Sequence, residues 1–209
     1  MGRLINGING QIIGKVGTVS GSSRNGIPYI KGPYKSRTLK VSERELANRK
    51  KFAAAQAWLA PLLDFVREGF KGYSQRSQGF VAAKSWLLKN AFVNDSSGLH
   101  IDPALVKVSS GDLPLPKDLA VSLTEAGNLK FSWTIANDGS KYYDQIMMLA
   151  YDVKTGYAAF NLTGQFRGTE SDTLSLDQSK GKNFFVYAAF NAADRSRQSD
   201  SLYLGEWNI

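Results

Sequence analysis

Few residues of this chain could carry out covalent or metal chemistry. It has a single histidine, His100, and no cysteine. Disulfides, thiolate metal sites, cysteine nucleophiles and multi-histidine metal sites are therefore excluded. Asp102 follows His100 by two residues, but a His–Asp pair needs a nucleophile beside it, and the sequence has no G-x-S-x-G turn to present a serine. We expect His100 to be a loop histidine without a catalytic role.

A phosphate-binding loop is the second candidate. Residues 14–18 read G-K-V-G-T and combine glycine with lysine, as phosphate loops do. The nucleotide-binding pattern G-x-x-x-x-G-K-[ST] is absent because Val16 follows Lys15, and no helical pattern follows the segment. The sequence therefore predicts no nucleotide hydrolysis.

Paired carboxylates are the third candidate. Asp194 lies near Asp200 in the sequence, and Asp138 near Asp144. All four fall in predicted turns, where aspartate commonly hydrogen-bonds the local backbone. Nothing in their spacing favours glycosidase chemistry, and residues 137–139 lack the periodicity of a calcium loop. We therefore predict a protein that is not an enzyme and that has no catalytic, metal or cofactor site.

Charge is distributed unevenly. Residues 1–93 hold sixteen Lys or Arg and four acids, a net charge of +12, whereas residues 94–209 hold ten and fourteen, a net charge of −4. Such asymmetry is typical of a chain that meets a polyanion, or of one whose basic end meets the acidic end of another copy. The candidate contact residues are Lys35, Arg37, Lys40, Arg49, Lys50 and Lys51. A solvated surface is the third interpretation of these charges.

Residues 1–41 are predicted to form an extended, glycine-rich β arm. The segment has eight glycines, but β-branched residues of the kind that suit strands lie between them. Asn25–Gly26 is a hairpin signal and predicts that strands 15–23 and 27–31 pair. Because an isolated hairpin is only marginally stable, the arm needs an acceptor surface. The side chains predicted to meet that surface are Ile8, Ile12, Val16, Val19, Ile27 and Tyr29.

Residues 42–98 change to helical periodicity. Ser42 and Glu45 form a capping-box pattern that predicts a helix start. Pro61 interrupts the apolar stripe that follows, so we expect a kink or break there, and Gly69 is the predicted end. A further helix is predicted from residue 78 to residue 92.

Residues 104–209 are predicted to be entirely β. Short runs of strand-forming residues alternate there with Gly, Pro, Asn and Asp, at the spacing of a β-sandwich. The predicted strands are 104–109, 118–123, 128–135, 144–152, 158–164, 172–176, 183–192 and 202–206. The alternation at Leu129, Phe131 and Trp133 places these three side chains on one inner face. The predicted fold class is α+β, with an N-terminal β arm, a helical segment and a C-terminal sandwich.

Two resemblances bear on this architecture. The proline-rich segment 113–116, Trp133 near the end of the second strand and the aromatic segment 185–191 resemble a fibronectin type III module over residues 113–206. Segments 14–17, 49–52, 69–70 and 106–113 are similar to a Bacteroidota family of unknown function and of about this length. That resemblance implies an architecture and no activity.

The function expected from these patterns is structural. We expect a homo-oligomer or filament held together by the N-terminal arm, since strand addition satisfies backbone donors at a sheet edge. The alternative is a nucleic-acid-binding protein that uses the basic residues between 3 and 51. No apolar run is long enough to span a membrane. With no signal peptide, the chain is expected in the cytoplasm at synthesis, and export by a non-Sec route stays open.

Overall fold

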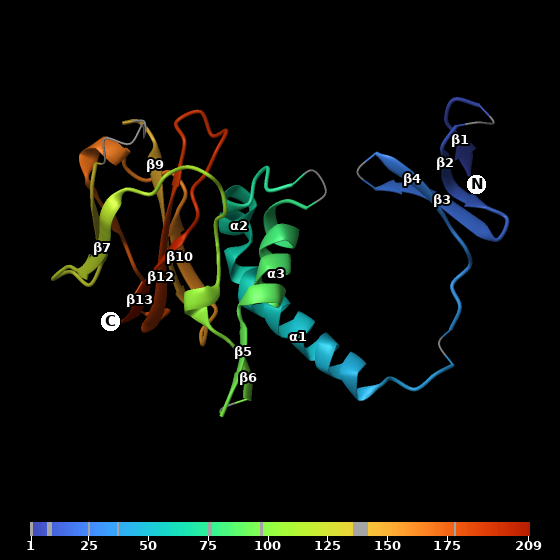
Figure 1. The fold of residues 1–209 in the computed structure, drawn as a ribbon, viewed down its shortest axis with the longest axis horizontal. Coiled ribbons are helices and arrows are strands. Elements are labelled where there is room, and N and C mark those ends of the chain that lie inside the picture. Colours follow the sequence, from blue (N-terminus) through green and yellow to red (C-terminus); the bar gives the residue numbers. More distant parts are fainter. Residues whose placement is uncertain are drawn as a thin grey trace. The chain divides into compact units, whose positions relative to one another are not determined.

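The chain is an α+β protein made of two compact units, residues 1–46 and 47–209. The computed structural model describes residues 2–7, 10–24, 26–36, 38–74, 77–96, 98–135, 142–177 and 179–209. Figure 1 shows a small sheet in the first unit, and helices against a larger set of strands in the second. Within the described part of the chain, no helix is long and apolar enough to cross a membrane.

The N-terminal unit is an antiparallel sheet in the order β1-β2-β3-β4. Its strands are β1 (Arg3–Leu4), β2 (Ile12–Val16), β3 (Val19–Arg24) and β4 (Ile27–Lys31). The predicted hairpin is confirmed, because Arg24 pairs with Ile27 across a two-residue turn in which Gly26 has a φ of 78°. Asn25 lies outside the described residues.

The single strand predicted over residues 15–23 is wrong. Val16 pairs with Val19, so the chain reverses at Gly17 and Thr18 and forms a second tight hairpin between β2 and β3. Gly17 has a φ of 58°, a conformation that glycine adopts without the steric cost of a side chain. The arm is therefore a folded meander and not one hairpin with an extended tail.

The segment predicted to be helical, residues 42–98, contains three helices, which lie where the sequence predicts them. They are α1 (Glu43–Leu59), α2 (Leu63–Gly69) and α3 (Gly79–Asn90). The Ser42 hydroxyl accepts the backbone N–H of Glu45 at 3.3 Å, as the capping pattern predicts. Pro61, which has no N–H to donate, lies in the 3-10 turn Ala60–Leu62 that separates α1 from α2.

Residues 92–101, predicted as a helix end and a loop, form a hairpin. Strand β5 (Phe92–Asp95) pairs with β6 (Gly98–Ile101), and Gly98 has a φ of 97° next to the turn. His100 therefore lies in a strand and not in a loop. Two four-residue strands are too short to show a reliable period, which is why the pattern was not visible in the sequence.

The strand predicted over residues 104–109 is also wrong. Residues Pro103–Leu105 form a 3-10 turn, started by Pro103 and capped by the Asp102 carboxylate, which accepts the Ala104 N–H at 2.9 Å. The chain then runs without regular structure, although Val108 and Ser109 are fully buried. A strong local turn signal outweighed the β-forming side chains.

The remaining seven predicted strands are present. They are β7 (Lys117–Leu123), β8 (Leu129–Thr134), β9 (Gln145–Asp152), β10 (Tyr157–Asn161), β11 (Ser171–Leu174), β12 (Asn183–Asn191) and β13 (Leu202–Asn208). Strands β10-β9-β12-β13 form one antiparallel sheet, and β11-β8-β7 form another.

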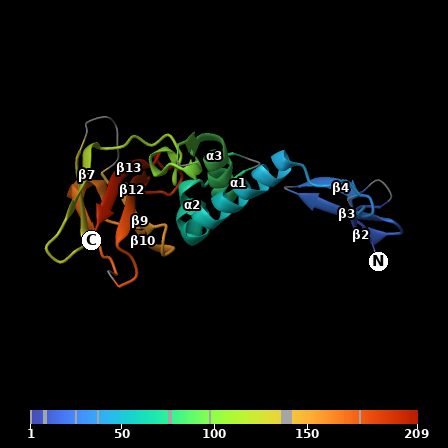
Figure 2. The same ribbon diagram turned by 90° about the horizontal axis from the view of Figure 1, so that it is seen from below.

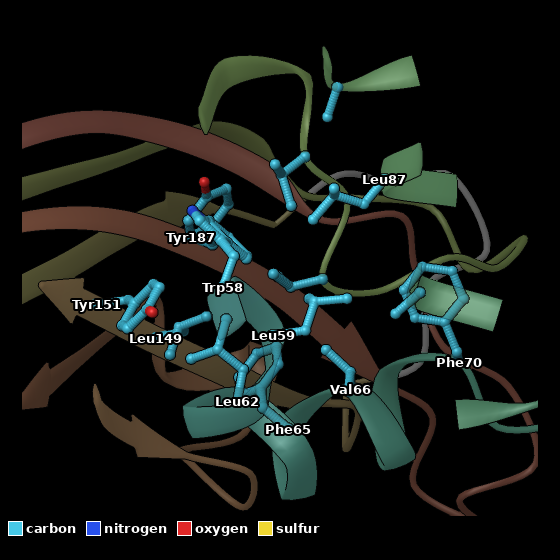
Figure 3. Close-up of a cluster of buried hydrophobic side chains, with 14 of the residues drawn as sticks. Trp58, Leu59, Leu62, Phe65, Val66, Phe70, Leu87, Leu149, Tyr151 and Tyr187 are labelled. Atoms are coloured by element: carbon cyan, nitrogen blue, oxygen red, sulfur yellow. The ribbon is translucent and has the colours of Figure 1, made fainter. Parts of the chain in front are cut away.

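The four-stranded sheet is covered on both faces. One face shares a hydrophobic core with the three-stranded sheet, through residues such as Phe131, Trp133 and Phe190. The other face packs against α1, α2 and α3, with Leu149 and Tyr187 among its core residues (Figures 2 and 3). This double burial explains why β9 and β12 are apolar almost throughout, as strands covered on both faces are.

Trp133 provides a test of the core between the two sheets. Its side chain is 4% exposed. The rings of Trp133 and Phe190 meet edge to face with their centroids 5.4 Å apart, and the indole N–H donates to the Arg167 carbonyl at 2.8 Å. Trp133→Ala should lower the free energy of unfolding by about 3 to 5 kcal/mol, measured by chemical denaturation. An unchanged denaturation midpoint and slope would contradict this placement.

Candidate functional site: the two faces of the N-terminal sheet

One face of the N-terminal sheet is apolar. Residues directly opposite each other in neighbouring strands share a face, and Gly14, Gly21 and Ile30 form such a row. A Cβ at Gly21 would lie 2.8 Å from the Cβ of Ile12, so Ile12 is on this face too. The apolar face, as we call it, carries Leu4, Ile12, Gly14, Val16, Val19, Gly21, Ser23, Pro28 and Ile30. It holds no charged residue.

The opposite face is basic. Lys15, Ser20 and Lys31 form one row across β2, β3 and β4, and Ser22 pairs with Tyr29 in another. Every Lys and Arg of the four strands lies on this side. The basic face, as we call it, carries Arg3, Ile13, Lys15, Ser20, Ser22, Arg24, Ile27, Tyr29 and Lys31.

Tyr29 is the centre of the basic face. The ammonium of Lys31 lies over its ring, 5.2 Å from the centroid. Hydrogen bonding with Ser22, together with the positive charges of Lys31 and Arg24, holds the pKa of Tyr29 below its usual value. A tyrosine so placed between cations offers a ring and a hydroxyl to a polyanion at the same point.

The described residues of the N-terminal unit do not form a layer over the apolar face. Gly21 is the only buried residue among those described in the N-terminal unit, and it is buried by the close approach of Ile12 in the same sheet. Ile30, Leu4 and Val16 are all about half exposed or more. A sheet with one apolar face generally packs that face against a second layer. The N-terminal unit, as described, supplies no such layer.

The predicted assembly residues are divided between the two faces. Ile12, Val16 and Val19 are together on the apolar face, whereas Ile27 and Tyr29 lie on the basic face. Ile8 lies outside the described residues. The sequence prediction missed Leu4 and Ile30 on the apolar face, because membership of a face depends on the register between strands. Alternation within residues 27–31 was the available signal, since it separates Ile30 from Ile27 and Tyr29.

The six Lys and Arg predicted to contact a partner are divided between the two units. The described residues among them do not form one surface. Lys35 and Lys50 are exposed, and Arg37 lies outside the described residues. Lys40 and Arg49 each have an interaction partner. Lys51, in α1, places its ammonium 5.6 Å from the centroid of the Phe92 ring. The cations that the structure does group together on one face are those of the strands.

Two of the residues weighed for catalytic chemistry, His100 and Asp194, lie in a strand and in a turn. No group of three or more His, Asp or Glu within the described residues could hold a metal ion. His100 is close to the exposed Asp95, with Nδ1 and Oδ1 3.6 Å apart. Its Nδ1 also lies 3.2 Å from the Gly98 carbonyl oxygen. Asp194 accepts the Ser196 N–H at 3.0 Å, as expected of a turn residue. Asp138 lies outside the described residues.

Asp144, predicted as a turn residue, is instead fully buried beside Arg167. Arg167 Nε and Asp144 Oδ2 are 3.7 Å apart, and the Arg167 backbone N–H donates to the Asp144 carbonyl at 2.6 Å. The guanidinium also donates to the Pro114 carbonyl at 2.6 Å and lies 4.6 Å from the Phe190 ring centroid. These contacts tie the segment before β7 to the sheet core, so this ion pair is structural. The separation of the two residues in the sequence gave no indication of this ion pair.

Two of the four segments behind the family resemblance, 69–70 and 106–113, meet in space at the end of α2. The Ser110 N–H donates to the Gly69 carbonyl at 2.8 Å, and the Ser109 hydroxyl lies 2.7 Å from the Ser199 carbonyl. A Cβ at Gly69 would lie 2.9 Å from the Cα of Ser109, which leaves no room for a side chain. These contacts fasten the helices to the sheets.

From residue 10 to residue 205, the chain matches a family of proteins of unknown function, DUF6266, and it belongs to that family. The match covers strands β2 to β4 as well as the second unit, so most of the N-terminal sheet is part of the family's architecture. No curated protein and no solved structure matches the chain.

Proposed function

We propose that this DUF6266 protein is a non-enzymatic interaction protein that self-assembles through its N-terminal sheet. The apolar face of one copy packs against the apolar face of a second copy. The observation that carries the proposal is the separation of side chains in the sheet, with apolar residues on one side, every strand cation on the other, and no second layer among the described residues of the unit.

Size supports this proposal. A unit of about 40 residues rarely buries enough apolar surface to fold alone, and disulfides, metals or oligomerisation usually supply the difference. The chain has no cysteine, and no metal-binding group occurs among the described residues. Association therefore accounts for the stability of the sheet with the fewest additional assumptions.

Charge supports a second copy as the partner. When two such sheets meet through their apolar faces, Lys15, Arg24 and Lys31 point away from the contact on both sides. No like charges then oppose each other in the interface. A two-fold contact of this kind uses the same surface on both copies and closes as a dimer.

We also propose that the second unit has the strand arrangement of a fibronectin type III module. Among its seven strands after residue 113, the first, second and fifth (β7, β8 and β11) form one sheet, and the other four form the second. This division, and the hydrophobic core that the two sheets share, support the proposal. The helices packed on the outer face of the four-stranded sheet are an addition to such a module.

A matched pair of variants tests the self-assembly. Ile30 and Ile27 lie in the same strand, with 60% and 58% of their surface exposed, but on opposite faces. Ile30→Thr should weaken self-association, because each dimer loses two apolar contacts worth about 1 kcal/mol each, or roughly 30-fold in Kd. Ile27→Thr should leave the Kd unchanged. Sedimentation velocity over a concentration series measures both.

Equal effects of the two variants would show that the apolar face has no special part in association. A monomeric wild-type protein at every concentration would reject self-assembly itself. Circular dichroism of both variants is the control, since Ile→Thr keeps a β-branched side chain in the strand.

Nucleic-acid binding is the second candidate function, and the basic face is the observation in its favour. Four cations on one side of a small sheet, with Tyr29 among them, could contact phosphates and stack a base. This use is compatible with assembly, because a face-to-face dimer would present two basic faces outward.

The salt dependence of DNA binding tests this second function. Lys15→Gln combined with Lys31→Gln should weaken binding to random-sequence DNA and reduce the salt slope by up to about two released counterions. Lys117→Gln combined with Lys130→Gln, on exposed positions of β7 and β8, is the matched control. If the two double variants bind DNA with the same slope, the basic face does not bind phosphates.

A further inference from the structure

The second unit contains an apolar pocket, and every residue that lines it belongs to that unit. It has a volume of about 600 Å³, within the roughly 300 to 1,000 Å³ typical of small-molecule sites. Helix α1 contributes one wall through Ala57 and Trp58, and Ile101 at the end of β6 contributes another. Tyr151 and Phe185, from the neighbouring strands β9 and β12, form the floor. Figure 3 shows Trp58 and Tyr151 near each other at this end of the core.

The walls are rigid and aromatic. The rings of Trp58 and Tyr151 meet edge to face, with their centroids 5.1 Å apart, and both residues are almost fully buried. Trp58 is fixed by the helix and Tyr151 by pairing on both sides of β9. Such a pocket is formed before any ligand arrives, so little ordering cost opposes binding.

Two polar groups of the pocket have no hydrogen-bond or ion-pair partner among the described residues. Tyr151 is 2% exposed, yet its hydroxyl forms no hydrogen bond with any residue that the structure describes. Burial, with a smaller contribution from Asp152, raises the pKa of Tyr151 to about 12, so the hydroxyl keeps its proton and can donate it. Lys154 also lines the pocket, and no described carboxylate forms an ion pair with its ammonium.

We propose that this pocket binds a small amphipathic carboxylic acid, with its aliphatic or aromatic body against Trp58 and Phe185 and its carboxylate near Lys154 and the Tyr151 hydroxyl. Both unpartnered groups are hydrogen-bond donors and one is a cation, so an acceptor with negative charge satisfies them and an amine does not. This site is independent of the proposed self-assembly, because every residue that lines it belongs to the second unit.

Filling the pocket tests its location. The probe is 8-anilinonaphthalene-1-sulfonate, an aromatic anion whose fluorescence rises in apolar sites, titrated into the full chain. Ala57→Phe places a ring in the pocket from an exposed position of α1 and should weaken probe binding at least tenfold. Ala53→Phe, also exposed on α1 but outside the pocket, should bind as the wild type does. Both variants keep the N-terminal apolar face, so any signal from that face cancels in the comparison.

Competition tests the head group. Decanoate should displace the probe from the wild-type protein at about tenfold lower concentration than decanol. Lys154→Gln should abolish that difference, whereas Lys130→Gln, at an exposed position of β8, should preserve it. Equal competition by decanoate and decanol in the wild type, or an unchanged preference in Lys154→Gln, would overturn the assignment of a carboxylic acid.

Sedimentation of the same variants separates a ligand site from a protein contact. If Ala57→Phe lowers the association state while probe binding stays at the wild-type level, a second copy occupies the pocket and the proposal is wrong. If Ala57→Phe and Ala53→Phe bind the probe equally, there is no site in this pocket. A loss of probe binding with unchanged association supports the site.

Discussion

An apolar sheet face must be covered by a second layer, and the two units of this chain meet that requirement differently. In the second unit the sheet β10-β9-β12-β13 is covered twice, by helices on one face and by a three-stranded sheet on the other. In the N-terminal unit the described residues provide one layer only. The second unit therefore contains its own core, and we propose that the first obtains its second layer from another copy.

The same constraint explains where the two proposed binding surfaces lie. The N-terminal sheet places its apolar residues on one side and its strand cations on the other, so one side can associate while the other meets solvent or a polyanion. In the second unit the helical layer passes over Tyr151 and leaves a pocket between α1, β6 and the ends of β9 and β12. Neither surface requires catalytic residues.

The sequence predicted those features that depend on local patterns. The helix start at Ser42, the break at Pro61 and the inward alternation of Phe131 and Trp133 follow from capping, proline geometry and period. Features that depend on register or on distant contacts were not predictable. Ile30 and Ile27 look alike in the sequence, and only the pairing of β3 with β4 assigns them to opposite faces.

The same limit applies to the pairs and pockets of the second unit. The Arg167–Asp144 pair joins residues whose separation in the sequence carries no signal. Whether a buried ion pair forms depends on the three-dimensional core around it. His100 was predicted in a loop because its four-residue strand has no period of its own. The pocket beside it combines residues from four separate segments, which no local pattern can bring together.

Chemical labelling of single thiols tests most directly whether the apolar face is buried between two copies. Because the chain has no cysteine, Ser23→Cys and Ser20→Cys each introduce one thiol, at exposed positions of β3 on the apolar and basic faces respectively. At concentrations where the protein self-associates, the thiol at position 23 should react with a maleimide at least tenfold more slowly than the thiol at position 20. Dilution below the Kd should remove the difference. Equal rates at all concentrations would contradict packing through the apolar face.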